Sequence, residues 1–211
     1  MKIVTLVSVL FAFSAVAATN DVFLIGDSIR QGYAPAVKEK MSGRWNVMFP
    51  SENCRFTYYT LRGLYDWVKA VPHPEQVEVV HWNNGLWDLG QRDHRPEPLT
   101  PIDVYTNTLV RILGEIRHYF PNAKVVFATT TPINTRIECE QHTFGNAIVE
   151  EYNAAAVKEL SKRGVVINDL YSFVRDRMSP EDYRDIVHYT PAGCAKQADE
   201  VIRVISGLLV K

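Results

Sequence analysis

The chain has 211 residues, of which 46% are hydrophobic and 11% aromatic, enough to bury the core of one domain and to exclude disordered and fibrous proteins. The formal net charge is -1. No overall positive charge therefore attracts nucleic acid or an anionic membrane, and we expect neither as a partner. Neutral or mildly polar substrates fit this charge better.

The first 18 residues resemble a signal peptide. Lys2 precedes an almost wholly apolar run, and Ala15-Val16-Ala17 offers small residues for signal peptidase. A membrane anchor is the alternative, but about 15 apolar residues are short for a span of about 20. We therefore expect residues 1–18 to be removed and residues 19–211 to form one domain, secreted or periplasmic, without stable membrane insertion. The oligomeric state stays open.

Three cysteines are present, Cys54, Cys139 and Cys194. An oxidising compartment would allow one disulfide, and the sequence does not choose the pair. Their spacing fits no metal-ligand pattern, so no metal site is expected.

Apolar runs typical of strands alternate with amphipathic stretches along the chain. Strands are predicted at 22–25, 45–49, 77–82, 123–128 and 165–168, and helices at 34–41, 60–70, 101–120, 147–163 and from 191 onward, with a short helical piece at 179–182. This alternation predicts an α/β fold with a central parallel sheet of about five strands between helices. In such sheets, ligands bind beyond the carboxyl ends of the strands.

The first strand ends at Gly26-Asp27-Ser28, which we interpret as a tight turn that places Ser28 at the start of a helix. Unpaired N–H groups and the helix dipole would stabilise negative charge there. The same triplet is also ordinary turn or capping material. Ser28 becomes a candidate nucleophile only if the chain supplies a base and an oxyanion donor.

His188 is the candidate base, because Asp185 precedes it by three residues in a loop before a proline-started helix. The carboxylate could bind one ring nitrogen and leave the other for Ser28. A chance pairing in a surface loop is the alternative.

Two amides, Asn83 and Asn84, follow the third strand directly. An Asx-turn that caps the strand is one reading. The functional reading is that Asn83, or its neighbour Asn84, donates to the oxyanion of a tetrahedral intermediate.

Together, Gly26-Asp27-Ser28, the Asn-bearing loop and Asp185-x-x-His188 resemble the SGNH (GDSL-type) hydrolase superfamily over nearly the whole mature chain. The resemblance implies a flavodoxin-like three-layer α/β/α fold and cofactor-free, metal-free ester hydrolysis. Ser28 would be the nucleophile, His188 the general base and Asp185 its orienting acid. Asp27 is counted with the candidate binding residues.

The chain departs from the family pattern in two blocks. The second block usually contributes a glycine N–H to the oxyanion hole, but residues 52–57 contain no glycine, so Cys54 or Arg55 would serve. The third block usually reads Gly-x-Asn-Asp, whereas Trp87 occupies the asparagine place. We therefore assign the amide role to Asn83.

The predicted function is an exported serine esterase that removes a small, acetyl-like acyl group from a carbohydrate or another small polar molecule. Aromatic residues expected near the site, Trp82, Trp87, Tyr58 and Tyr59, favour a sugar, unless they pack in the core. Two alternatives remain. One is a lipase or thioesterase that uses the same triad, and the other is a non-catalytic carbohydrate-binding module that keeps the fold.

Overall fold

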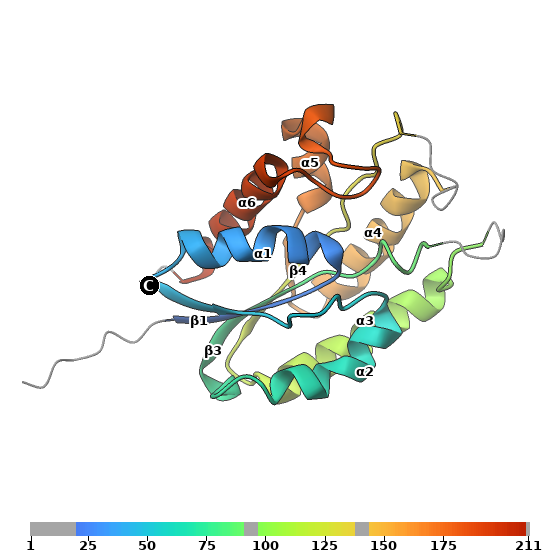
Figure 1. The fold of residues 1–211 in the computed structure, drawn as a ribbon. Helices are drawn as coiled ribbons and strands as arrows, with labels where there is room; N and C mark the ends of the chain where they lie inside the picture. Colours follow the sequence, from blue (N-terminus) through green and yellow to red (C-terminus); the bar gives the residue numbers. More distant parts are fainter. Residues whose placement is uncertain (1–19, 91–96, 138–143, 210–211) are drawn as a thin grey trace, which may run out of the picture.

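The computed structural model describes residues 20–90, 97–137 and 144–209. Five strands form one parallel sheet in the order β2-β1-β3-β4-β5 (Figure 1). They are β1 (Asn20–Ile25), β2 (Trp45–Met48), β3 (Val77–Trp82), β4 (Lys124–Ala128) and β5 (Val166–Asn168). The predicted α/β fold with a five-stranded parallel sheet is confirmed.

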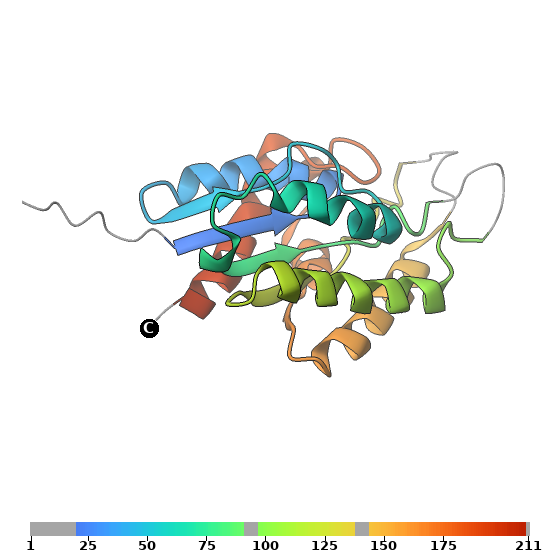
Figure 2. The same ribbon diagram turned by 90° about the horizontal axis from the view of Figure 1, so that it is seen from below.

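Helices cover both faces of this sheet. The helices α1 (Ser28–Lys40) and α6 (Pro191–Leu209) pack together on one face, and α2 (Thr57–Val68), α3 (Ile102–Tyr119) and α4 (Asn146–Ser161) lie side by side on the other (Figures 1 and 2). The shorter α5 (Leu170–Arg177) contacts α6, and two 3-10 turns, η1 (Pro74–Gln76) and η2 (Pro180–Asp182), complete the fold. The strand order reverses direction between β1 and β3, and the carboxyl ends of these two strands are where such sheets bind ligands.

The central strand β3 is buried almost throughout. Trp82 is 0% exposed and packs edge-on against Phe127 of β4, so it belongs to the core rather than to an exposed aromatic surface as the sequence suggested. His81 is equally buried between Tyr33 and Asn168, and burial lowers its pKa to about 3. His81 is therefore a neutral, structural residue of the core.

Helix α1 begins at Ser28, as the Gly26-Asp27-Ser28 turn predicted, because the Asp27 carboxylate accepts the Ile29 N–H and caps the helix; the run predicted at 34–41 is its later half. Other helix boundaries differ from the prediction. Helix α2 begins at Thr57, whose N–H is bound by the distant Asp88 carboxylate, a long-range cap that local sequence does not reveal. Helix α5 was not predicted; Asp169 caps it by accepting the Ser172 N–H.

The expected signal peptide and Cys139 lie outside the described residues. Cys54 and Cys194 are free thiols, so these two do not form the disulfide that the sequence left open. Within the described ranges, no helix is both long and apolar enough to cross a bilayer.

Candidate active site

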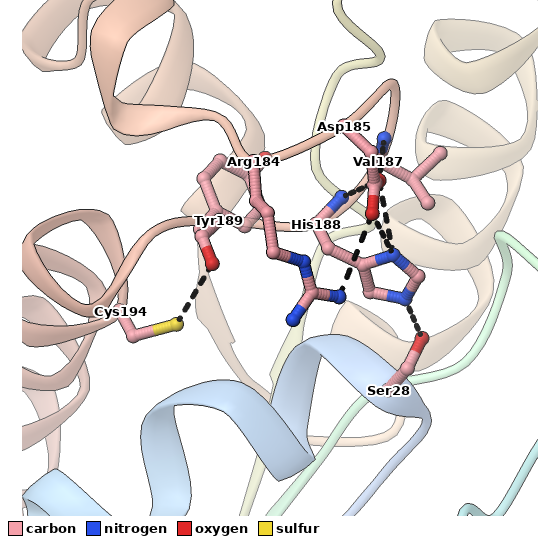
Figure 3. Close-up of polar contacts among 7 residues, drawn as sticks. All are labelled: Ser28, Arg184, Asp185, Val187, His188, Tyr189 and Cys194. Carbon is pink, nitrogen blue, oxygen red and sulfur yellow. Dashed lines mark hydrogen bonds and ion pairs between the residues drawn. The ribbon is translucent and has the colours of Figure 1, made fainter.

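Ser28, Asp185 and His188 meet at the carboxyl edge of the sheet. Ser28 is the first residue of α1, directly after β1, and the other two lie in the loop that leads to α6. His188 Nε2 is 2.9 Å from Ser28 Oγ, and His188 Nδ1 is 2.9 Å from Asp185 Oδ2 (Figure 3). The three side chains thus form a continuous chain of hydrogen bonds from carboxylate to imidazole to hydroxyl.

The Asp185 carboxylate is held by its own loop. Asp185 Oδ1 accepts the backbone N–H groups of Val187 and His188 at 3.0 and 2.7 Å. Partial burial would raise the pKa of Asp185, but these two N–H groups and the His188 ring outweigh it and lower the pKa to about 2. An ionised Asp185 requires the proton on Nδ1 of a neutral His188, which leaves Nε2 free to accept the Ser28 proton.

Asp27 and Asn83 form a buried pair beneath the serine. Asn83 Nδ2 donates to Asp27 Oδ1 at 3.1 Å, and the two residues are 4% and 1% exposed, respectively. Burial raises the pKa of Asp27 although Asn83 and the Ile29 N–H both favour its ionised form. A Cβ on Gly26 would lie 1.9 Å from Asn83 Oδ1, so only glycine fits between strand β1 and this amide. Asp27 therefore supports the serine loop from below rather than facing substrate.

Asn84 is fully engaged in the interior. Its Nδ2 donates to the Arg55 carbonyl and to Thr60 Oγ1, both at 2.9 Å, and its Oδ1 accepts from Trp82 Nε1 at 2.6 Å. Because an amide nitrogen has two N–H bonds, Asn84 has no donor left for a substrate. Asn83 uses one N–H on Asp27 and retains the other, so Asn83 is the better candidate of the two for an oxyanion donor.

In the second block, Arg55 has a left-handed backbone conformation, which glycine adopts most easily. It is the one non-glycine residue with positive φ (51°) in the described part of the chain. The Cys54 N–H is committed to the Gly26 carbonyl at 3.1 Å, whereas the Arg55 N–H donates at 2.8 Å to the side chain of Asn53, which can rotate away. Arg55 is therefore the candidate backbone donor in this block.

Arg30 is a site residue that the sequence reasoning missed. Its side chain is 1% exposed, and its guanidinium donates to the carbonyls of Gly26, Pro50 and Glu52. It thereby ties the serine loop to the loop that leads to Arg55. The sequence feature that could have identified Arg30 is its position. It is a charged residue on the apolar face of α1, one turn before the buried Ala34 and two turns before the buried Val37.

Asp88 is the second residue that the sequence reasoning missed. It is 0% exposed and accepts the N–H and hydroxyl of Thr57, which links the third-block loop to the start of α2. Burial raises its pKa to about 6, against the hydrogen bonds from Thr57 and Thr100. The preceding Trp87, in the usual asparagine place, lies near Arg55, whose guanidinium carbon is 5.9 Å from the Trp87 ring centroid.

A pocket of about 280 Å³ opens beside Ser28 and His188. Its walls come from the first turns of α1 and from the segment 184–194, and its lining residues are Ser28, Ile29, Gln31, Gly32, Arg184, His188, Tyr189 and Cys194. In residues 20–90, 97–137 and 144–209, no three His, Cys, Asp or Glu side chains gather as a group that could hold a metal ion.

Solved structures with similar folds include several hydrolases. A "putative platelet activating factor" from Streptococcus pneumonia superposes with a TM-score of 0.74 at 18% identity, over 91% of this chain and 86% of that one. An acetyl xylan esterase, AlAXEase, gives 0.69 at 18% identity, over 88% and 99% of the two chains. A carbohydrate esterase family 3 protein from Talaromyces cellulolyticus gives 0.66 at 18% identity, over 90% and 98%. These likenesses establish the fold.

No curated protein matches the chain in sequence. The profile of the GDSL-like Lipase/Acylhydrolase family, however, matches residues 24–196, a span that runs from the serine loop through Asp185 and His188 into α6. The resemblance to SGNH (GDSL-type) hydrolases is thereby confirmed, and the chain belongs to the GDSL-like lipase/acylhydrolase family, whose members are ester hydrolases.

Proposed function

We propose that this protein is an exported serine esterase that removes a small acyl group, such as acetyl, from a carbohydrate. The observation that carries the proposal is the unbroken chain of hydrogen bonds from Asp185 through His188 to Ser28, which opens onto a pocket. A serine hydroxyl is a weak nucleophile on its own, and this arrangement supplies a base with a fixed tautomer.

The reaction has two halves. Ser28 Oγ attacks the acyl carbon while its proton passes to His188 Nε2, and the tetrahedral intermediate collapses when His188 returns that proton to the leaving alcohol oxygen. The acyl group stays on Ser28. A water molecule then attacks the acyl carbon, His188 takes its proton and gives it back to Ser28, and the carboxylic acid leaves.

The oxyanion of both intermediates needs donors aimed at it. The N–H of Ser28 is available because the first N–H groups of a helix have no partner within the helix. The Arg55 N–H and the second N–H of Asn83 are the other candidates. Loss of one such donor costs about 3 kcal/mol of transition-state stabilisation in comparable enzymes.

Three observations support a carbohydrate ester as the substrate. The pocket of about 280 Å³ lies near the lower limit of ligand pockets, room for one sugar-sized group rather than a long chain. Tyr58, an early residue of α2, is exposed and offers an aromatic face of the kind on which sugars stack. Two proteins of similar fold are named as an acetyl xylan esterase and a carbohydrate esterase.

Export, single-domain organisation and the absence of a cofactor remain part of this proposal. Export rests on the signal-peptide pattern of residues 1–18, and cleavage there would leave a mature chain of residues 19–211. N-terminal sequencing of protein recovered from the periplasm or medium would test both.

Hydrolysis of 4-nitrophenyl acetate by the wild type and by Ser28→Ala is the direct test. The variant should keep its fold and lose turnover, and a fluorophosphonate probe should label the wild type at Ser28 alone. Retained turnover in Ser28→Ala would refute the role of the serine. A preference for octanoyl over acetyl esters would favour the lipase or thioesterase alternative, and a wild type that neither reacts nor hydrolyses would favour the binding module.

A further inference from the structure

The pocket beside Ser28 is placed to receive the alcohol part of the ester. His188 must deliver its proton to the leaving oxygen, so the alcohol lies on the His188 side of the scissile bond. His188 and Ser28 line the pocket, whereas the two oxyanion candidates that lie outside α1, Arg55 and Asn83, do not. The acyl oxygen would thus point away from the pocket and the alcohol into it.

The pocket carries a positive charge from Arg184 and, among its lining residues, no carboxylate. In Figure 3 the Arg184 side chain descends from its loop and holds its guanidinium between Cys194 and the His188 ring, above the first turn of α1. The base of the side chain is fixed, because the Arg184 N–H donates to the His188 carbonyl at 2.8 Å. The backbone of Arg184 thus holds the root of the side chain beside His188, and the guanidinium extends from there over the pocket.

The guanidinium has donors to spare. Among the described residues, the guanidinium approaches Asp185 Oδ2 at 3.5 Å through a terminal nitrogen, which is at the limit of hydrogen-bond length, and the side chain is 65% exposed. Asp185 does not depend on it, since the carboxylate already accepts the N–H groups of Val187 and His188 and binds the His188 ring. A planar fork of N–H donors beside a nucleophile is suited to a carboxylate or phosphate.

We propose that this pocket is a subsite for an alcohol that carries an oxyanion, a carboxylate as in a uronic acid or a phosphate as in a sugar phosphate, and that Arg184 binds that anion. The inference rests on the proposed esterase function and deepens it, because it names the substrate class. The overall charge of the chain is nearly balanced, so the selectivity comes from this single local charge. Gly32 and Cys194 both line the pocket, and a Cβ on Gly32 would lie 3.0 Å from Cys194 Sγ, so a larger side chain at position 32 would crowd this wall.

The test compares kcat/KM on matched acetyl esters. The substrates are a methyl O-acetylglucuronide, the methyl O-acetylglucoside acetylated at the same hydroxyl, and an O-acetylglucose 6-phosphate. The variants are Arg184→Gln and Arg184→Lys, with Arg203→Gln as the matched control, an arginine of α6 that pairs with Glu200 on the helix surface. The ratio of kcat/KM for the acidic ester to kcat/KM for the neutral ester cancels any effect of the substitution on the triad itself.

We expect the wild type to prefer an acidic ester by about tenfold, mainly through KM, and the preference to fall as salt rises. Arg184→Gln should remove the preference, Arg184→Lys should keep part of it, and Arg203→Gln should leave it at the wild-type value. The arm that shows the preference, glucuronide or phosphate, identifies the anion. Equal ratios in the wild type and in Arg184→Gln would overturn the inference.

The inference can fail separately from the esterase function. If the wild type hydrolyses the neutral ester but shows no acidic preference, the subsite is refuted and the esterase stands. If no ester is hydrolysed, calorimetric binding of methyl glucuronide, glucose 6-phosphate and methyl glucoside to the wild type and Arg184→Gln still decides. Tighter binding of one anionic ligand that is lost with Arg184 supports the subsite, and equal binding of all three refutes it.

Discussion

His188 Nε2 lies 2.9 Å from Ser28 Oγ although 160 residues separate them in the chain. The two residues flank helices that pack against each other on the same face of the sheet, because Ser28 opens α1 and His188 lies just before α6. The α1–α6 contact thus sets the distance between the proposed nucleophile and base. Packing on this face, rather than any local motif, brings the two together.

Replacing Asp185 with Asn should lower kcat by about 100- to 10,000-fold while the fold is retained. The Asn oxygen can still accept the two backbone N–H groups of Val187 and His188. Its NH₂ group would then face His188 Nδ1, which must give up its proton and place it on Nε2. That tautomer cannot accept the Ser28 proton, and steady-state kinetics on 4-nitrophenyl acetate measure the loss.

A pH–rate profile separates this explanation from simple loss of structure. The pKa of about 2 keeps Asp185 ionised throughout the range above pH 4, so its titration should contribute nothing to the wild-type profile there. An additional acid limb that disappears in Asp185→Asn would contradict the assignment. A single cooperative thermal unfolding transition of the variant at pH 7 is the control for folding.

The two asparagines after β3 should give opposite phenotypes when each is replaced by alanine. Asn83→Ala removes a candidate oxyanion donor and should lower kcat by about 100- to 1,000-fold. Asn84→Ala leaves the Arg55 carbonyl, Thr60 and Trp82 Nε1 without their buried partner. It should reduce the free energy of unfolding by about 2–4 kcal/mol.

Both quantities should be measured on each variant. Chemical denaturation gives the free energy of unfolding, and titration with the fluorophosphonate probe counts active sites so that kcat refers to folded protein. A larger loss of kcat per site in Asn84→Ala than in Asn83→Ala would reverse the assignment of the donor.

Local patterns in the sequence predicted the strands well, because each apolar run corresponds to a strand buried between two helix layers. The proposed triad was also predictable, since Gly26-Asp27-Ser28 and Asp185-x-x-His188 are short segments with their chemistry contained in them. The start of α2 was not predictable, because its capping group is Asp88, 31 residues further along the chain. Long-range caps leave no local signal.

The two amides illustrate the same limit at the site. The sequence does not distinguish two adjacent asparagines. Only the structure shows that Asn84 donates both its N–H bonds to Arg55 and Thr60, whereas Asn83 donates to Asp27. Arg184 was likewise not identified from the sequence. Its proposed role depends on the pocket between α1 and the loop before α6, which only the structure shows.

Arg30→Lys should lower kcat more than it changes KM. The guanidinium reaches three carbonyls, those of Gly26, Pro50 and Glu52, with a planar fork that a lysine ammonium cannot reproduce. The loop that positions Arg55 would then shift, and with it a candidate oxyanion donor. Arg30 acts here as a positioning residue, since its side chain is buried away from substrate.

The control for Arg30 is Arg30→Met, which fills similar volume but leaves the three carbonyls unpaired. It should cost about 3–5 kcal/mol of unfolding free energy, more than Arg30→Lys does. If Arg30→Lys lost stability but kept the wild-type kcat per active site, Arg30 would have a purely structural role.

The contribution of Asp88 to the stability of the folded chain should fall as pH rises from about 4 to 6. Burial raises the folded-state pKa of Asp88 to about 6 from an unfolded value of 3.8. Below pH 3.8 the carboxyl is protonated in both states. Between the two values the unfolded chain releases its proton first, so unfolding becomes more favourable with each pH increment and the slope ends above pH 6.

Asp88→Asn should flatten this slope by on the order of 2–3 kcal/mol across the interval, because the amide keeps an oxygen for the Thr57 N–H and hydroxyl but carries no charge. Urea denaturation at half-unit pH intervals measures it. Asp103→Asn, at the exposed start of α3, controls for the change in net charge.

Asp27, whose pKa burial also raises, contributes in the same direction and accounts for slope that persists in Asp88→Asn. An identical slope in the wild type and Asp88→Asn would show that Asp88 is ionised in the folded protein without cost, held by its Thr57 hydrogen bonds alone.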